Sequence, residues 1–172
     1  MHSFFVKTID YQGGEYGIAV LSKFPIVDSA AYKLPKQEDA GGEPSGLATV
    51  TVQLKSGKKL KFASTHFDLK APNKALQAAA VVRIFKDEPL PVILAGDFNA
   101  GPESEPIARL DKAFTRTCTE GCGFTIPQVN PKRTIDYIMF RKPERFEVLS
   151  HRVINEEYAS DHLPILAILK VK

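Results

Sequence analysis

The chain has 172 residues, of which 44% are hydrophobic and 25% charged, and its formal net charge is +3. These values match an ordinary soluble globular protein, and the length predicts a single domain over residues 1–172. No apolar run approaches the length of a membrane span, so we expect no integral membrane association. A charge balance this close to neutral permits a phosphate-bearing partner but does not require one.

Strands dominate the first half of the chain. Residues 1–15 are mixed in character and end in a turn signal at Gln12-Gly13. The elements that follow are a strand over 16–22, a Pro- and Gly-rich loop over 33–46, a strand over 47–54 and a strand over 60–66. Ser56-Gly57 separates the last two strands, so they are predicted to form an antiparallel hairpin.

The second half mixes helices and strands. Pro72 suits the first turn of an Ala-rich helix over 72–85, whose polar residues Asn73, Gln77, Arg83 and Asp87 fall on one side of a helical wheel. The broad apolar side is expected to pack on a sheet. The later elements are a strand ending near Gly96, a short helix over 103–114, a loop over 115–133, and strands over 134–140, 146–153 and 163–171. This order predicts an α+β layered fold with mostly antiparallel strand pairs.

The segment Val92–Ala100 carries the first candidate site residues. Its apolar run is short, rich in β-branched residues and bounded by proline and glycine, which predicts a buried strand. Alternate residues of a strand point the same way, so Asp97 and Asn99 share a side and Phe98 faces the core. The same three residues also fit a turn capped by its own side chains.

Polar clusters also lie at the ends of other predicted strands. His66 ends one strand, Asp136 lies in an apolar one, and Asp161-His162 precedes the last. Singly, His66 could be a core histidine, Asp136 could pair with Arg133 or cap a turn, and Asp161-His162 could be loop residues. Together, an Asp–His pair beside acid and amide oxygens predicts metal-assisted attack of water on a phosphodiester, with Mg²⁺, Mn²⁺ or Ca²⁺ rather than zinc.

The order of these motifs resembles the endonuclease/exonuclease/phosphatase family, the superfamily of the pancreatic-type deoxyribonucleases. The matching segments are 17–26, Ser64-Thr65-His66, Gly96-Asp97-Phe98-Asn99, Ile135-Asp136-Tyr137-Ile138 and Ser160-Asp161-His162. The resemblance implies a four-layer α/β/β/α sandwich of two mainly antiparallel sheets, with helices outside. It also implies a metal-dependent phosphoester hydrolase, nuclease-like, acting on phosphodiester or phosphomonoester bonds.

The resemblance assigns roles to five catalytic residues. His162 is the general base or, alternatively, a charged hydrogen-bond donor to the phosphate, and Asp136 orients it. His66 contacts the scissile phosphate and stabilises developing charge. Asp97 and Asn99 position the attacking water and the phosphate.

The expected metal contacts are Asp97 and Asp161. The family's principal metal ligand, a glutamate in a sequence like LQEV on an early strand, has no counterpart, because the context of Glu15 differs. The resemblance therefore implies a domain incomplete at its N-terminus, which binds Mg²⁺ weakly and hydrolyses little. A sheet without those strands would expose its edges, so we expect self-association.

Three alternatives stay open at this point. The lysines of the 55–61 hairpin could attract the phosphates of a nucleic acid or form a solvated tip. The substrate could instead be a phospholipid or sphingomyelin, or the chain could be a non-catalytic binding module that retains the fold. Cys118 and Cys122 lie four residues apart without a CxxC motif, and either a local disulfide or two thiols fits this spacing.

Overall fold

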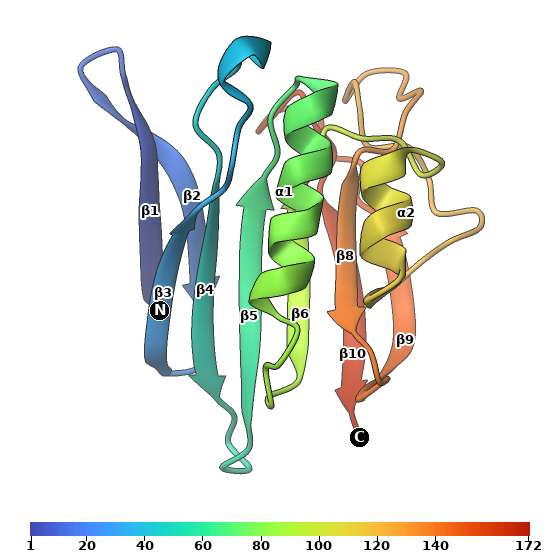
Figure 1. The fold of residues 1–172 in the computed structure, drawn as a ribbon. Coiled ribbons are helices and arrows are strands. Elements are labelled where there is room, and N and C mark those ends of the chain that lie inside the picture. The colour runs from blue at the N-terminus through green and yellow to red at the C-terminus, as the bar shows by residue number, and fades with distance from the viewer.

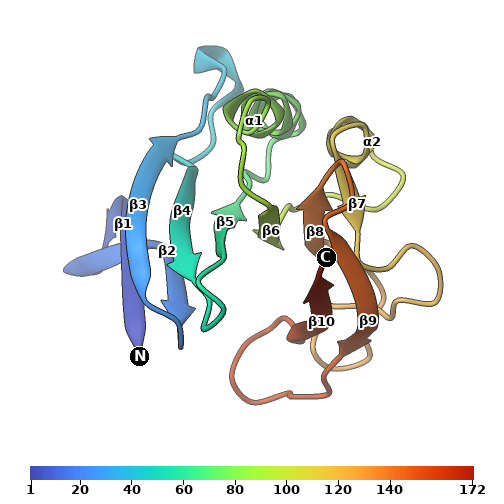
Figure 2. The same ribbon diagram turned by 90° about the horizontal axis from the view of Figure 1, so that it is seen from below.

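The computed structural model describes residues 1–172 and shows a central sheet with helices on one face and two hairpins on the other (Figures 1 and 2). The strands are β1 (His2–Tyr11), β2 (Gly14–Ser22), β3 (Ile26–Lys33), β4 (Gly46–Gln53), β5 (Lys59–His66), β6 (Val92–Asp97), β7 (Phe114–Arg116), β8 (Asp136–Arg141), β9 (Phe146–Val153) and β10 (Ile165–Val171). The helices are α1 (Ala71–Ile84) and α2 (Glu105–Asp111), with a short 3₁₀ turn at Glu38–Ala40.

The central sheet has six strands in the order β3-β4-β5-β6-β8-β7. Its pairs are antiparallel except for β5 and β6, which are parallel because the chain crosses back through α1. The hairpins β1–β2 and β9–β10 lie on the face opposite the helices (Figure 2). The predicted α+β sandwich with mainly antiparallel sheets is confirmed. Both helices cover the same face, so residues 1–172 form three layers where the resemblance implies four.

Two apolar clusters hold these layers together. The larger one joins the central sheet to the helices and includes Leu94 and Met139 from the sheet and Val81 from α1, all fully buried. The smaller one joins β1–β2 to the other face of the sheet through Ile18 and Val50. Successive side chains of β4 point alternately to the helix face and to the hairpin face of the sheet. All but the last of them are buried, because both faces are covered.

The polar side of α1 is not a solvent-facing side. The helical wheel predicted that the apolar residues pack inward, yet Asn73 and Gln77 are also fully buried. The Asn73 amide donates to Asp68 Oδ2 (2.8 Å) and its oxygen accepts the Gln37 backbone N–H (2.8 Å). The Gln77 oxygen accepts the Asp68 N–H (2.9 Å). Both residues can be buried because groups outside the helix supply their hydrogen bonds.

Most predicted elements are present with shifted ends. The hairpin over 47–66 and the strand over 146–153 form as predicted, and the second helix is shorter than predicted because Phe114 already belongs to β7. Three strands lie where no strand was predicted, β1, β3 and β7. Most side chains of β3 are exposed, so its sequence lacks the alternation that marks a half-buried strand. No helix of the chain is both long and apolar enough to span a membrane.

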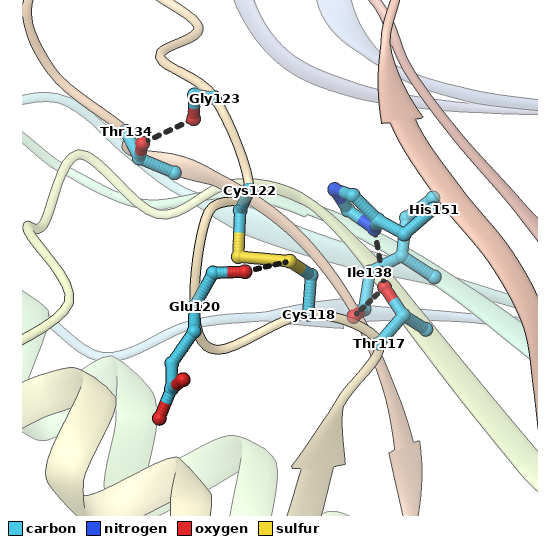
Figure 3. Close-up of a disulfide and its surroundings, with 8 residues drawn as sticks. All are labelled: Thr117, Cys118, Glu120, Cys122, Gly123, Thr134, Ile138 and His151. Carbon is cyan, nitrogen blue, oxygen red and sulfur yellow. Dashed lines mark hydrogen bonds between the residues drawn. A yellow bond between two sulfur atoms is a disulfide. The ribbon is translucent and has the colours of Figure 1, made fainter.

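A disulfide joins Cys118 and Cys122, whose Cα atoms lie 5.7 Å apart (Figure 3). The bond resolves the two alternatives that the spacing left open. Next to it, the Thr117 hydroxyl donates to the Ile138 carbonyl (3.0 Å) and lies 2.8 Å from Nδ1 of His151. These contacts attach the disulfide loop to β8 and β9.

The two hairpins have open edges. β2 pairs only with β1, and β10 pairs only with β9, so each has one edge whose backbone groups lack a strand partner. Large apolar side chains are exposed on these strands, with Leu21 67% exposed and Ile168 51% exposed. Open, apolar strand edges readily pair with further strands.

We predict that the protein self-associates through these edges. Sedimentation velocity should show a dimer or larger species whose fraction grows with concentration, and Leu21→Lys or Ile168→Lys should reduce it, because a lysine on an edge strand opposes pairing. Tyr158→Lys is the matched control, since Tyr158 is 98% exposed but lies outside every strand. A monomer at all concentrations would contradict the prediction.

Candidate functional site

Three neighbouring strands of the central sheet end in polar residues at the same edge. His66 is the last residue of β5, Asp97 the last of β6, and Asp136 the first of β8. The register pairs His66 with Asp97 and Asp97 with Asp136. The sheet itself therefore sets these three side chains in one row.

Gly96 makes this row possible. A Cβ atom at position 96 would lie 1.9 Å from the Thr65 carbonyl oxygen of the neighbouring strand. No side chain fits at that distance, so only glycine lets β5 and β6 approach in this register.

The turn that follows β6 brings Asn99 back over the row. The Asn99 N–H donates to Asp97 Oδ1 (2.7 Å), and its φ of 49° is one that asparagine tolerates. Phe98 is fully buried, as predicted. The Asn99 amide donates to the Phe67 carbonyl (2.8 Å) and lies 3.1 Å from His66 Nε2. The capped turn and the cluster of site residues, which the sequence left as alternatives, are the same structure.

His162 joins the row from the loop before β10. Its Nδ1 lies 3.1 and 3.0 Å from the two carboxylate oxygens of Asp136. Its Nε2 lies 4.0 Å from Asp97 Oδ2. Of the partners considered for Asp136, the structure shows His162 and not Arg133.

Thr125 holds both members of this pair and was missed by the sequence analysis. Its hydroxyl accepts the Ile135 N–H (3.3 Å) and its carbonyl accepts the Leu163 N–H (2.7 Å). Ile135 precedes Asp136 and Leu163 follows His162, so one fully buried residue fixes the backbone beside each. A threonine in a predicted loop gives no signal of such a role.

Asp97 carries the most perturbed charge of the site. Burial raises the pKa of its carboxyl above the ordinary value of 3.8, and the negative charge of Asp136 adds to this. The Asn99 N–H, His66 and His162 act in the opposite direction. An ionised Asp97 is therefore a partly desolvated carboxylate that a cation would stabilise.

Asp97, Asp136 and His162 can present one ligand atom each within 4.8 Å of one another. Carboxylate and imidazole groups suit a divalent cation. Both oxygens of Asp136 already accept from His162, which leaves Asp97 Oδ2 as the more available ligand. Asp161 is exposed and lines the same cleft outside this group, so its metal contact stays a prediction.

A cleft of about 750 Å³ is lined by His66, Asp97, Asn99, Asp161 and His162, and also by Lys70, Lys74 and Arg133. Asp136 lines a second cavity, of about 410 Å³. Lys74 Nζ donates to the Asn99 carbonyl (2.6 Å). Four carboxylates, those of Glu43, Asp68, Asp97 and Asp161, line the same cleft, so the three cations offer individual contacts for a phosphate group and not a net positive charge. The lysine hairpin is not part of the cleft, because it precedes β5 whereas the site lies at the far end of that strand (Figure 1).

The comparison with known families agrees with this geometry. Residues 2–162 match the model of the Endonuclease/Exonuclease/phosphatase family. The chain belongs to this family. The match includes all five expected catalytic residues and both expected metal contacts.

Solved structures of the family share the fold. An endonuclease/exonuclease/phosphatase protein of Bacteroides vulgatus has a TM-score of 0.83 at 20% identity, covering 99% of this chain and 76% of that chain. A mannosyl-6-phosphatase of Bacteroides thetaiotaomicron has a TM-score of 0.78 at 19% identity, covering 98% and 77%. A mutant beta toxin of Staphylococcus aureus with bound magnesium ions has a TM-score of 0.69 at 19% identity, covering 88% and 67%.

Gly96→Ala should destabilise the protein by about 3 kcal/mol, because the new methyl group forces β5 and β6 apart. Chemical denaturation followed by circular dichroism measures the change. Gly101→Ala is the matched control, since a Cβ there meets nothing within 4 Å and its φ is not positive. Equal stability of the two variants would refute the packing constraint.

Asp97→Asn should stabilise the metal-free protein at neutral pH. Because the folded pKa of Asp97 is raised, the folded state binds the proton more tightly, and its stability falls as pH rises from 3.8 through the folded pKa. Removing the charge should add on the order of 1 kcal/mol at pH 7, a rise in Tm of roughly 2–4 °C. Thermal unfolding in EDTA at pH 7 and pH 3.5 measures this.

The gain should shrink at the lower pH, where Asp97 is protonated in both states. Asp87→Asn, at an exposed position, is the control and should leave Tm unchanged at both pH values. A lower Tm for Asp97→Asn at pH 7 would show that the buried charge is already compensated.

Proposed function

We propose that the protein is a metal-dependent phosphoester hydrolase that cleaves phosphodiester or phosphomonoester bonds. The observation that carries the proposal is the Asp136–His162 pair, whose histidine lines the cleft beside Asp97. Family membership supports the reaction class.

His162 acts as the general base in this proposal. The Asp136 carboxylate can only accept a hydrogen bond, so it holds the proton on Nδ1 and leaves the lone pair on Nε2. The 4.0 Å between Nε2 and Asp97 Oδ2 exceeds a direct hydrogen bond, and a water there could contact both. Nε2 would take the proton of that water as the water attacks phosphorus, and the ester P–O bond would break with its electron pair leaving on the alcohol oxygen.

The opposite side of the cleft binds the phosphate. The Asn99 amide and His66 Nε2 lie 3.1 Å apart and both face the cleft beside Asp97. Hydrogen bonds and the charges of Lys70, Lys74 and Arg133 would stabilise the negative charge that grows on the phosphoryl oxygens.

Mg²⁺, Mn²⁺ or Ca²⁺ is the cofactor that this donor set fits best, with Asp97 as the first ligand and Asp161 near it. When bound, the ion supplies charge neutralisation at the phosphate. We expect weak binding, because both Asp136 oxygens are engaged by His162 and Asp97 is the one other carboxylate of the Asp97–Asp136–His162 group.

The cleft volume of about 750 Å³ suits a small ligand, and the similarity to a mannosyl-6-phosphatase places sugar phosphates among the substrates to test. A single-stranded nucleic acid could place one of its phosphodiester groups in the same cleft.

With millimolar Mg²⁺ or Mn²⁺, the protein should hydrolyse bis-p-nitrophenyl phosphate or p-nitrophenyl phosphate slowly, and EDTA should stop the reaction. His162→Ala should lower kcat/KM at least roughly 100-fold, as expected for loss of a general base. Released p-nitrophenolate, measured by absorbance, reports the rate.

His2→Ala is the control, because His2 is exposed on β1 and lies outside the cleft. Turnover that survives both EDTA and His162→Ala would refute the function. Fast turnover at micromolar Mg²⁺ would refute only the weak metal site. Phosphate binding without turnover would favour the binding-module alternative.

A further inference from the structure

The cavity of about 410 Å³ that Asp136 lines has no role in the proposed function. It adjoins the catalytic pair, because Asp136 lines this cavity while its partner His162 lines the cleft. Its walls come from β7, the disulfide loop (residues 117–125), β8 and the hairpin β9–β10. Its volume falls within the range of sites that bind small molecules.

The disulfide loop forms one wall of the cavity without any helix or strand. Cys118, Gly121 and Cys122 line the cavity, and the disulfide joins the two cysteines (Figure 3). On the other side of the loop, the Thr134 hydroxyl donates to the Gly123 carbonyl (2.7 Å). The covalent bond and the hydrogen bond hold this wall in shape before any ligand binds, which lowers the cost of ordering it on binding.

Most hydroxyl groups around the cavity are already engaged within the protein. Those of Thr117 and Thr134 donate to backbone carbonyls (3.0 and 2.7 Å), and that of Thr125 accepts a backbone N–H (3.3 Å). The fourth lining threonine, Thr119, lies on the exposed part of the loop. The cavity therefore offers few partners for the several hydroxyls of a sugar.

The two charged side chains of the cavity are engaged as well. Arg116 donates from Nε and Nη2 to the carboxylate of Asp111 (3.1 and 3.0 Å). Both oxygens of Asp136 lie within 3.1 Å of His162 Nδ1. The Asp136 carboxylate opposes an anion and the Arg116 guanidinium opposes a cation, so the cavity favours an uncharged ligand.

Two lining side chains each keep one nitrogen without a partner in the protein. Arg116 keeps Nη1, which can only donate a hydrogen bond. His151 Nδ1 lies 2.8 Å from the Thr117 hydroxyl, and Figure 3 shows its other ring nitrogen, Nε2, pointing away from Thr117. Burial lowers the pKa of His151, so the ring is neutral at pH 7 and Nε2 can make one hydrogen bond in either tautomer.

Phe124 adds an aromatic ring to these polar atoms. It lines the cavity, yet it is 52% exposed, so much of its apolar surface faces water. A flat ring stacked on Phe124 would remove that surface from water. Ile138, Val153 and Ile165 give the rest of the cavity an apolar lining.

We propose that this cavity binds an uncharged heteroaromatic ring with a hydrogen-bond acceptor on its edge, the chemistry of a nucleobase. The ring stacks on Phe124, and its polar edge meets Arg116 Nη1 and His151 Nε2. The site is additional to the proposed function and does not require that the protein hydrolyses any ester. The ring can be part of a substrate whose phosphate lies in the cleft or of a separate ligand, since both present the same chemistry.

Adenine is the probe, because it is uncharged and flat and has acceptors on its edge. In NMR titrations of the ¹⁵N-labelled protein, adenine should cause saturable shifts of the Gly121 and Phe124 backbone signals and the His151 ring signals, with or without inorganic phosphate. Methyl α-mannoside should leave these signals in place. Phe124→Ala should weaken adenine binding roughly tenfold, the scale of one lost stacking contact, whereas Phe124→Tyr keeps the ring and should bind nearly as before.

Val129→Ala is the matched control. Val129 is also 52% exposed and lies between β7 and β8, but it lines neither the cavity nor the cleft. It should bind adenine like the unmodified protein, and thermal unfolding shows that each variant is folded. Cavity signals that adenine does not move, tighter binding of methyl α-mannoside at the cavity, or equal adenine affinity of Phe124→Ala would overturn the proposal.

Adenosine 5′-monophosphate separates the two sources of the ring. If the base belongs to the substrate, adenine competes with this nucleotide, and Phe124→Ala lowers kcat/KM for its hydrolysis roughly tenfold. If the ring belongs to a separate ligand, adenine and the nucleotide bind together, and Phe124→Ala hydrolyses the nucleotide at the unmodified rate. Both results support the cavity site. Absence of all turnover would refute the proposed function, and the adenine titration would still decide this proposal.

Discussion

The close approach of β5 and β6 is the constraint on which the site depends. The Thr65 carbonyl occupies the space that a Cβ at position 96 would need, so this register exists only with Gly96. The register sets His66 beside Asp97, and the next strand pair sets Asp97 beside Asp136. Three polar groups from distant parts of the chain thus meet on a rigid support, and no loop has to hold them in place.

Buried polar side chains attach the surrounding loops to this support. Asn73 binds the Asp68 carboxylate, Gln77 binds the Asp68 N–H, and Thr125 binds the residues beside Asp136 and His162. No buried side-chain polar atom lacks a hydrogen-bond partner, so their burial does not carry the cost of an unmade bond. A hydrogen bond fixes the orientation of the two groups that it joins, whereas apolar packing fixes only that the groups are in contact.

Local signals in the sequence predicted much of this structure, and long-range pairs explain what they missed. The hairpin over 47–66 and the Asp97–Asn99 turn follow from strand alternation and turn residues, which act within a few positions. A helical wheel assigns polar residues to solvent, so it could not anticipate that Gln77 is satisfied by a distant loop. The Asp136–His162 pair spans 26 residues and was expected only from the family resemblance, whereas the Tyr16–His66 contact spans 50 residues and was not predicted, because no spacing rule reports such contacts.

The two histidines of the cleft show how the layers of the fold act together. Their rings are chemically identical and both are partly exposed, but their Nδ1 partners differ, Asp136 for His162 and the Tyr16 hydroxyl for His66. Asp136 belongs to the central sheet, whereas Tyr16 belongs to the hairpin on its far face. Each histidine therefore has its Nδ1 partner in place only once both layers have assembled. Loss of the β1–β2 packing would leave the Asp136–His162 pair intact and remove the Tyr16 contact of His66, because the two contacts come from different layers of the fold.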